Sequence, residues 1–363
     1  MDEWIEKTWG DVLTLQRGYD ITKSEQFLDG EVPVVSSGGI SSYHSEAMSA
    51  GPGVIIGRKG TLGRVHFVDG PFWPHDTTLW VKDFKGNNPK FTYYALKLLT
   101  PGDMNVGSAS PTLNRNHVHP LGVLWPRESA TQDGIAEVLG ALDDKIAANE
   151  RVARLADEFS TAIFTQSASE PGCELASVAQ VVMGSSPPGT SYNEVGNGTP
   201  FYQGVRDFGL RSPTPRVWTT SPVRLAETGD TLLSVRAPVG TVNLAPSVLC
   251  VGRGLAALRS RVGTPSTLFQ QVRSATASWV EFNSEGTVFG AINRSQLERV
   301  KIPTVDPETQ LELEATLTAI GASLAGVVHQ SVVLARTRNQ LLPLLMSGRM
   351  SVASAEREVS DVV

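Results

Sequence analysis

Two long stretches with helical apolar periodicity constrain this chain more than any other feature. Between Thr131 and Gln166, apolar residues recur at steps of three and four, so they share one face of a helix. A helix of this length is a rod of roughly 54 Å, longer than the core of a small domain requires. The stretch therefore predicts a long helix that packs against a partner. The residues of its apolar stripe are Ile135, Leu139, Leu142, Ile146, Ala153, Ala156 and Ile163.

A second stretch, from Thr309 to Leu345, repeats this pattern. Asp306 and Pro307 supply an N-cap and a first-turn proline, and Pro343 is placed to end or kink the last turn. Each half of the chain is thus expected to close with a long helix. The apolar residues of the second stripe are Leu313, Leu317, Ile320, Leu324, Val327, Leu334, Leu341 and Leu345.

The two halves of the chain can also be aligned with each other. Arg58 and Arg236 are 178 residues apart, and the Asn-Arg pairs that begin at Asn114 and Asn293 are 179 residues apart. A matching glycine pair upstream is only 166 residues apart, which places an insertion of about a dozen residues in the second copy, between Gln203 and Gly229. This period is far too long for a solenoid repeat. We therefore predict a duplicated module, a globular domain followed by a helix.

These observations predict an α+β protein with two mixed α/β domains, each followed by a long helix. Its length of 363 residues fits two domains of about 150 residues with connecting helices. We expect the first domain at residues 1–130 and its helix at 131–170. The second domain is expected at 171–305 and its helix at 306–350, and residues 351–363 are expected to be a disordered tail.

Composition narrows the class of protein further. The hydrophobic fraction is 40%, no apolar run approaches the roughly 18 residues of a membrane span, and the first residues are acidic. Two cysteines are too few for a disulfide framework and favour a cytoplasmic protein. The net charge is −6, but residues 171–305 carry twelve basic against eight acidic residues, and eleven of the twelve are arginine. Arginine binds guanine edges and phosphates with a bidentate fork, which weakly favours DNA binding.

Motifs for catalysis are missing. The chain has no Walker A sequence, no S-adenosylmethionine loop with an Asn-Pro-Pro-Tyr motif, no nucleophile elbow and no paired zinc ligands. His117 and His119 could share a face, but a metal site needs a further ligand at a recognisable spacing. We therefore expect no catalytic residues, no metal and no cofactor, and favour a binding or scaffolding role over an enzyme.

One loop in each half stands out as a candidate binding site. In the first half, a strand leads into the basic loop Gly57 to Arg64, whose glycines either make a tight turn or hold a phosphate. The equivalent loop of the second half begins at Arg236 but continues as Ala237 to Gly240 and lacks the other basic residues. This difference suggests that each domain recognises something different.

Several motifs, in order, resemble the DNA-specificity (S) subunits of type I restriction-modification systems. The first half contains VVSSGGISSYH (34–44), GRKGTLGRV (57–65) and PFWPHDTTL (71–79). The second contains GDTLLSVRAPVG (229–240), VGRGLAAL (251–258) and GTVFGAINRSQL (286–297). The ending LLPLLMSGRMSV (341–352) is similar to the close of the family's second conserved helix. The resemblance covers nearly the whole chain.

This resemblance implies both an architecture and a function. The two long helices would pair as an antiparallel coiled-coil spacer with pseudo-twofold symmetry between two target recognition domains. Each domain would read one half of a bipartite site in double-stranded DNA. Two adenine methyltransferase (modification) subunits would bind the helices, and restriction subunits would join for cleavage. The S subunit itself would be non-catalytic, cytoplasmic and not bound to a membrane.

Polar and basic residues of equivalent loops are the candidate DNA contacts. An alternative role for Arg58 and Arg236 is to bond turn carbonyls and anchor the fold, and Asn114 and Asn293 are expected to cap or brace loops. The candidate DNA-binding residues are Ser36, Ser37, Tyr43, His44, Arg58, Lys59, Arg64, Arg115, Gln203, Arg206, Arg236 and Arg294. The expected seam between the helices consists of Leu139, Leu142, Ile146, Leu317, Ile320 and Leu324.

Three other functions remain open at this stage. The chain could target a different methyltransferase or effector to DNA in another defence system built on the same scaffold, which neighbouring genes would reveal. It could be a nuclease of unfamiliar type, for which metal-dependent cleavage by the purified chain is the test. It could also be a coiled-coil adaptor that binds no DNA, although two large domains with different loops count against that.

Overall fold

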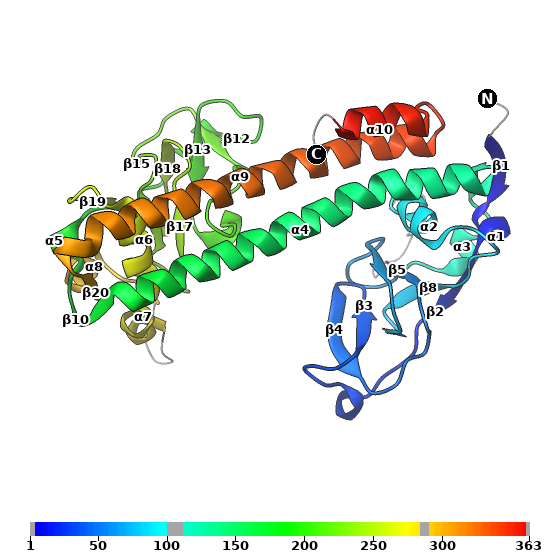
Figure 1. Cartoon of the computed structure of the whole chain (residues 1–363), viewed down its shortest axis with the longest axis horizontal. Helices are drawn as coiled ribbons and strands as arrows, with labels where there is room; N and C mark the ends of the chain where they lie inside the picture. Colours follow the sequence, from blue (N-terminus) through cyan, green and yellow to red (C-terminus); the bar gives the residue numbers. More distant parts are fainter. Residues whose placement is uncertain (1–3, 100–111, 284–289, 361–363) are drawn as a thin grey trace. The chain divides into compact units, whose positions relative to one another are not determined.

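The computed structural model describes residues 4–99, 112–283 and 290–360, and the chain divides into two compact units. Unit 1 consists of Met1–Ala148 and Gln330–Val363, and unit 2 of Asn149–His329. Each unit therefore contains one globular domain and a part of each long helix (Figure 1). Parts of the GTVFGAINRSQL motif and of the expected tail lie outside the described residues.

Two sheets and the separate antiparallel pair of β1 and β9 form the first globular domain, in unit 1. The larger is antiparallel with the order β2-β8-β5-β6, and the smaller has the order β4-β3-β7 with β3 and β7 parallel. The strands are β1 (Trp4–Thr8), β2 (Thr14–Arg17), β3 (Val32–Ser36), β4 (Gly39–His44), β5 (Gly53–Gly57), β6 (Val65–Val68), β7 (Trp73–Pro74), β8 (Thr78–Asp83) and β9 (Gly122–Pro126). The helices are α1 (Trp9–Val12), η1 (Lys23–Glu25), α2 (Pro89–Leu96) and α3 (Arg115–Val118).

The second globular domain, in unit 2, repeats this arrangement. Its four-stranded sheet has the order β11-β19-β16-β17, and its second sheet the order β12-β14-β13-β18-β15. The strands are β10 (Ala168–Glu174), β11 (Ala179–Met183), β12 (Tyr192–Asn193), β13 (Thr199–Tyr202), β14 (Trp218–Thr219), β15 (Leu225–Ala226), β16 (Thr231–Ser234), β17 (Val242–Leu244), β18 (Leu249–Val251), β19 (Leu255–Ser260) and β20 (Lys301–Val305). The helices are α5 (Leu175–Val178), η3 (Gly189–Ser191), η4 (Val205–Asp207), α6 (Pro265–Ser274), α7 (Thr276–Asn283) and α8 (Arg294–Arg299).

The predicted duplication is confirmed by matching connections in the two domains. Strand β1 pairs with β9 in the first domain, and β10 pairs with β20 in the second. The parallel pair β3 and β7 corresponds to the parallel pair β13 and β18. Gly18 and Gly184 also occupy equivalent positions at which another backbone segment approaches closely. A Cβ on either glycine would lie 2.1 Å from a backbone carbonyl oxygen. The two domains are therefore α+β modules of one design.

The long helices are α4 (Ser129–Ser167) and α9 (Pro307–Met346), and within each unit they lie side by side (Figure 1). In unit 1, Leu139 and Leu142 of α4 share a core with Leu334, Leu341 and Leu345 of α9. The start of α4 thus meets the end of α9, which defines an antiparallel pair. The core is closed by apolar residues from α2 and β9.

The same antiparallel order holds in unit 2. Phe164, near the end of α4, shares a core with Leu313 and Leu317, near the start of α9. Of the other expected seam residues, Leu324 is buried and both Ile146 and Ile320 are partly buried. The expected fold class is confirmed, since both domains are α+β and each is followed by one of two long, paired helices.

A carboxylate of α4 in each unit, partly buried in unit 1 and buried in unit 2, attaches the helix to its neighbours. In unit 1, Asp143 pairs with Arg338 of α9 and accepts a hydrogen bond from the Tyr94 hydroxyl at 2.7 Å. In unit 2, Asp157 pairs with Arg211 at 2.9 Å and with Arg273 at 2.7 Å. Arg211 lies in the segment that the sequence identified as an insertion in the second copy. This insertion therefore holds the second domain against α4.

One expectation about the C-terminal part needs correction. Pro343 lies in the last turn of α9, which ends at Met346; Gly348, at φ +67°, follows in the left-handed region. Residues 352–360, expected within a disordered tail, form α10 (Val352–Ser360). Ala355 of this helix is buried in the core of unit 1.

The expectation that no stretch approaches a membrane span also needs correction. Within the described residues, α9 is long and apolar enough to cross a membrane, with a mean hydropathy of 1.6 in its most apolar window. Length and composition alone are weak evidence for a span, because core helices meet the same criterion. Here the leucines at both ends of α9 pack into the cores of the two units.

We expect replacement of Asp157 by alanine to lower the free energy of unfolding by about 3–5 kcal/mol, because it leaves the buried charge of Arg211 without its partner. Urea denaturation measures this change. The exposed neighbour Glu158 provides a control, for which Glu158→Ala should change stability by less than about 0.5 kcal/mol. Equal effects of the two substitutions would contradict the assigned role of the buried pair.

The contribution of Asp157 should also depend on pH. Burial raises the pKa of this carboxyl, but hydrogen bonds from Arg273 and Arg211 outweigh burial and hold it below its ordinary value of 3.8. The stabilisation is therefore present above about pH 4 and is lost as the pH falls through the folded-state pKa. Asp157→Ala should remove this part of the acid sensitivity.

Candidate nucleic-acid interface

The basic loop of the first domain is a closed turn after β5. Gly57 donates its backbone N–H to the Arg64 carbonyl at 2.8 Å, and Gly63 donates to the Gly57 carbonyl at 2.9 Å. A Cβ on Gly57 would lie 2.0 Å from the Thr61 carbonyl oxygen, so this position requires glycine. The structural explanation for the glycines therefore holds, and the turn leaves Lys59 and Arg64 exposed to solvent.

The turn between β3 and β4 lies against this loop. The Ser36 hydroxyl bonds to the Gly39 carbonyl at 2.9 Å, and His66 bonds to the Ser37 carbonyl at 3.1 Å. A Cβ on Gly57 or Gly60 would come within 3.3 Å of the Ser37 side chain. The fold thus brings Ser36 and Ser37 together with the basic loop.

The ring of His66, which bonds to the turn between β3 and β4, is neutral. Burial, and to a smaller extent the nearby charge of Arg64, lower the pKa of His66, while its bond to Ser37 opposes the shift. The ring is therefore uncharged at pH 7. Sequence reasoning did not select His66, because a lone histidine on a strand carries no signal of its own.

Arg58 is held by its backbone and has an unused side-chain donor. Its N–H bonds to the Thr77 carbonyl at 2.8 Å, and its carbonyl accepts from Leu113 at 2.9 Å. One terminal nitrogen of its guanidinium is buried and has no hydrogen-bond partner among the described residues. A buried donor without an acceptor is costly, so an external acceptor such as a phosphate or a base edge would relieve it.

Tyr43 and His44 lie away from this group. In the β3–β4 ladder His44 is opposite Val32, whereas the turn is at Ser36 and Gly39. His44 is 8% exposed, its ring stacks on Trp73 at 4.2 Å, and its Nδ1 accepts the Glu46 N–H at 2.8 Å. Its side chain therefore has a structural role in the fold.

The expected roles of the two asparagines are confirmed. Asn114 caps α3 by accepting the Asn116 N–H at 3.0 Å, and Asn293 forms a capping box with Gln296 on α8. The arginines that follow them differ. Arg115 is exposed with no side-chain partner among the described residues, whereas Arg294 pairs with Glu298 at 2.8 Å.

In the second domain, polar residues from three loops line one hollow of about 190 Å³. Gln203 follows β13, Arg236 follows β16, and Arg253 lies in the turn between β18 and β19. This turn is held against Gln203 because Gly254 donates to the Gln203 carbonyl at 3.1 Å. A Cβ on Gly254 would lie 2.3 Å from that oxygen. The sequence analysis missed Arg253, although it noted the glycine-flanked motif that contains it.

Five of the eleven arginines of this domain are engaged in ion pairs, and the two that line the hollow, Arg236 and Arg253, are not among them. Arg236 and Arg206 are exposed and have no side-chain partner among the described residues, and Arg253 bonds through Nε to the Ser186 hydroxyl at 3.2 Å. Their charges are therefore available to a ligand. The engaged arginines are Arg211, Arg216, Arg259, Arg273 and Arg294.

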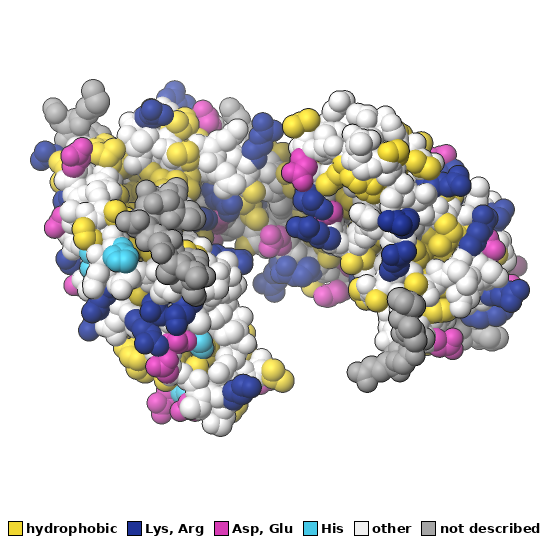
Figure 2. Space-filling view, turned by 180° about the vertical axis from the view of Figure 1, so that it is seen from behind, with side chains coloured by type: hydrophobic (Ala, Val, Ile, Leu, Met, Phe, Trp, Pro, Cys, Tyr) yellow, Lys and Arg dark blue, Asp and Glu magenta, His cyan; other side chains and the backbone are white. Residues whose placement is uncertain are grey.

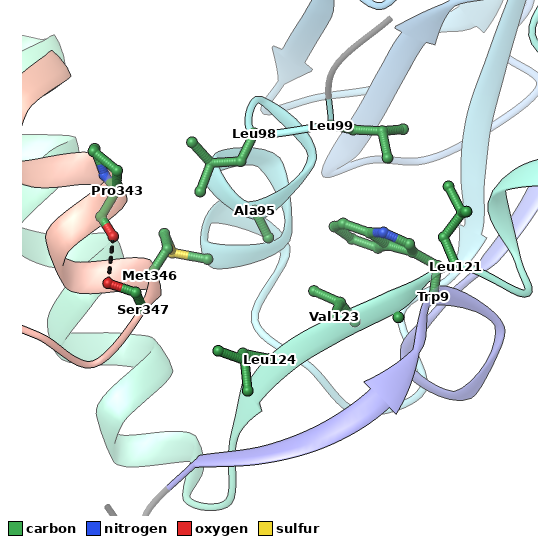
Figure 3. Close-up of a pocket in the computed structure, with 11 residues that line it drawn as sticks. Trp9, Ala95, Leu98, Leu99, Leu121, Val123, Leu124, Pro343, Met346 and Ser347 are labelled. Atoms are coloured by element: carbon green, nitrogen blue, oxygen red, sulfur yellow. Dashed lines mark hydrogen bonds between the residues drawn. The ribbon is translucent and has the colours of Figure 1, made fainter. Parts of the chain in front are cut away.

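A hollow in the first domain has a different chemistry. The one in Figure 3, of about 430 Å³, lies between α1, α2, β9 and the end of α9 in unit 1, and its lining is almost entirely apolar. Within the described residues no group of three or more His, Cys, Asp or Glu could hold a metal ion. Figure 2 shows exposed Lys and Arg side chains on the surfaces of both domains.

We expect His44 and Lys59, both candidates from sequence, to respond differently to alanine. His44→Ala should lower the free energy of unfolding by about 1–3 kcal/mol, because it removes the ring stacked on Trp73 and the acceptor of the Glu46 N–H. Lys59→Ala should change it by less than about 0.5 kcal/mol, because the side chain is exposed. Thermal and urea unfolding of the two variants test this; the reverse order would contradict the placement.

Two comparisons with known proteins give matches of the same kind, to type I restriction specificity proteins. Residues 1–155 match the family described as "Type I restriction modification DNA specificity domain". A relative from Methanocaldococcus jannaschii, a putative type I restriction enzyme MjaX specificity subunit, is 36% identical over 174 residues, which cover 48% of this chain and 41% of that protein. The match thus spans about two fifths of the relative's length.

Two solved structures are similar over nearly their whole length. The type I restriction-modification S subunit from M. genitalium has a TM-score of 0.65 at 16% identity and covers 94% of this chain and 96% of its own. The HsdS subunit from Thermoanaerobacter tengcongensis has a TM-score of 0.39 at 24% identity and covers 96% and 97%. The first likeness shows a shared fold. The resemblance of the chain to type I specificity subunits is therefore confirmed.

Proposed function

We propose that this chain is the non-catalytic DNA-recognition subunit of a type I restriction-modification complex. One domain reads each half of a bipartite site in double-stranded DNA, and the helices position adenine methyltransferase subunits, with restriction subunits joining for cleavage. The complex acts in the cytoplasm. The observation that carries this proposal is the duplicated fold with different side chains in equivalent loops.

The loops supply two kinds of DNA contact. Lys59, Arg64 and Arg115 are exposed cations that can bind phosphates, which contribute affinity but no sequence information. Ser36, Ser37 and Arg58 in the first domain, and Gln203, Arg206 and Arg236 in the second, are the candidates for base edges. Different base contacts on one scaffold let the two domains read different half-sites.

An exposed apolar stripe on α4 is the candidate surface for a methyltransferase subunit. Val152, Leu155 and Phe159 recur at steps of three and four and are 51%, 55% and 59% exposed. On the same part of the helix Ala153, Asp157 and Ser160 are buried within unit 2. The helix therefore has one face in the protein and a second apolar face in water, which is typical of a helical docking surface.

Co-expression of the chain with the methyltransferase encoded beside it, followed by single-molecule sequencing of the host DNA, tests the proposed function. We expect methylated adenines at one bipartite motif. Replacing residues 171–305 with the corresponding domain of another S subunit should change only one half of that motif. A stable complex that methylates no bipartite motif would rule out sequence recognition by this chain.

We also expect the double variant Leu155→Asp, Phe159→Asp to lose the methyltransferase subunit, because two charges would have to be buried at the contact. Co-purification and analytical ultracentrifugation measure the loss. Glu150 and Glu158 are exposed on the same segment of α4, so Glu150→Gln, Glu158→Gln is the matched control and should retain the partner. If the aspartate variant binds as well as the wild type, the partner contacts another surface.

A further inference from the structure

We infer that Arg236 and Arg253 form a guanine-reading pair in the second domain, so that its half-site contains a guanine whose major-groove edge enters the hollow between them. This inference rests on the proposed DNA-binding function and deepens it. It names the base and adds Arg253, which lies 17 residues beyond Arg236 in sequence but lines the same hollow.

The geometry brings the two guanidinium groups to one place from different strands. Arg236 follows β16 and Arg253 precedes β19, and these strands are hydrogen-bonded neighbours. The Val235 N–H bonds to the Gly254 carbonyl at 2.9 Å, and the Ile292 N–H bonds to the Val235 carbonyl at 3.0 Å. The backbone on which each arginine stands is thus fixed by the sheet, which reduces the entropy lost on binding.

The hollow offers strong donors and no carboxylate. Its lining consists of Gln203, Gly204, Val205, Ser234, Arg236, Ala237, Arg253 and Gly254. The nearest acid in sequence, Asp207, is engaged by Arg216 at 3.0 Å. The Ser234 hydroxyl donates to the Pro238 carbonyl at 2.6 Å. The free hydrogen-bonding groups are therefore the guanidinium donors and the Gln203 amide.

This donor set selects among the base edges in the major groove. Guanine presents two acceptors there, O6 and N7, which match the two parallel N–H groups of an arginine fork. Cytosine presents an amino donor, which two cations cannot accept, and adenine presents one acceptor beside one donor. Thymine presents a single acceptor, O4, beside a methyl group. Two arginines without a carboxylate therefore favour guanine over the other three bases.

The described part of the first domain lacks this pair of arginines at the equivalent place. At the position equivalent to Arg236 it has Arg58, whose N–H bonds to the carbonyl of Thr77 in the turn between β7 and β8. The Thr77 hydroxyl in turn accepts the N–H of Ser37. No second arginine occupies the place of Arg253. The two domains thus share one arginine and differ in the group beside it.

The experiment is selection of double-stranded DNA from a randomised pool by the full-length chain with its methyltransferase subunit. The variants are Arg236→Lys, Arg253→Lys, Arg236→Gln and Arg253→Gln. The control is Arg299→Lys, because Arg299 is exposed on α8 and lies outside the hollow. Both target arginines are exposed, so the variants should fold, and thermal unfolding checks this.

For the wild type we expect a bipartite sequence with a guanine in one half. Both lysine variants should lower the preference for that guanine by about 5-fold to 150-fold, the range that one good bidentate contact provides, while leaving the other half unchanged. The glutamine variants should lose the preference equally, and the control should keep it. Lysine retains the charge but not the fork, so this pattern identifies base reading.

Three results would overturn the inference. Lysine variants that keep the full preference while glutamine variants lose affinity would show that the hollow binds a phosphate. A selected bipartite sequence in which no preference for guanine changes in either arginine's variants would show that the pair does not read guanine. A wild-type complex that selects no sequence at all would overturn the proposed function as well, and so is distinguishable from the first two.

Discussion

The packing of α4 against α9 within each unit is the constraint on which the structure depends. The core of unit 1 contains Leu139 and Leu142 from the helix that follows its own domain, and Leu334, Leu341 and Leu345 from the helix that follows the other. In unit 2, Phe164 of α4 packs with Leu313 and Leu317 of α9 in a cluster separate from the cores of the second domain's sheets. The core of the first domain therefore contains apolar surface that the second half of the chain supplies.

Ionic contacts fix the domains on these helices. Asp143 is bound by Arg338 and Tyr94 in unit 1, and Asp157 by Arg211 and Arg273 in unit 2. Such buried pairs contribute little net stability compared with apolar packing, but they penalise every arrangement that leaves a charge unpaired. For a protein proposed to hold a recognition domain at a set place along a spacer, this specificity of orientation is the useful property.

The candidate interfaces are the surfaces whose charged or apolar side chains are left uncovered by the rest of the described chain. Within the described part of the second domain, arginines that hold the fold are paired with carboxylates, and those around the hollow are left available. A positive group without a protein partner is stabilised by a polyanion such as DNA. The apolar stripe of α4 is the corresponding case for a protein partner, because its exposed side chains gain from being covered.

The sequence by itself determined the features that depend on local periodicity and on chain order. Steps of three and four predicted α4 and α9, the Asn-Arg spacing predicted the duplication, and Asn114 and Asn293 were recognised as caps because capping is decided within a few residues. The insertion between Gln203 and Gly229 could be located for the same reason, but not its role as the source of Arg211.

Only the tertiary structure decided which side chains are free. Arg294 is paired with Glu298, and the ring of His44 is stacked on Trp73, whereas Arg253 became a candidate when its turn met Gln203. The reason is physical: whether a charge is neutralised depends on groups brought together by the fold. Sequence spacing fixes neighbours along the chain, whereas the pairing of β16 with β19 and of α4 with α9 fixes neighbours in space.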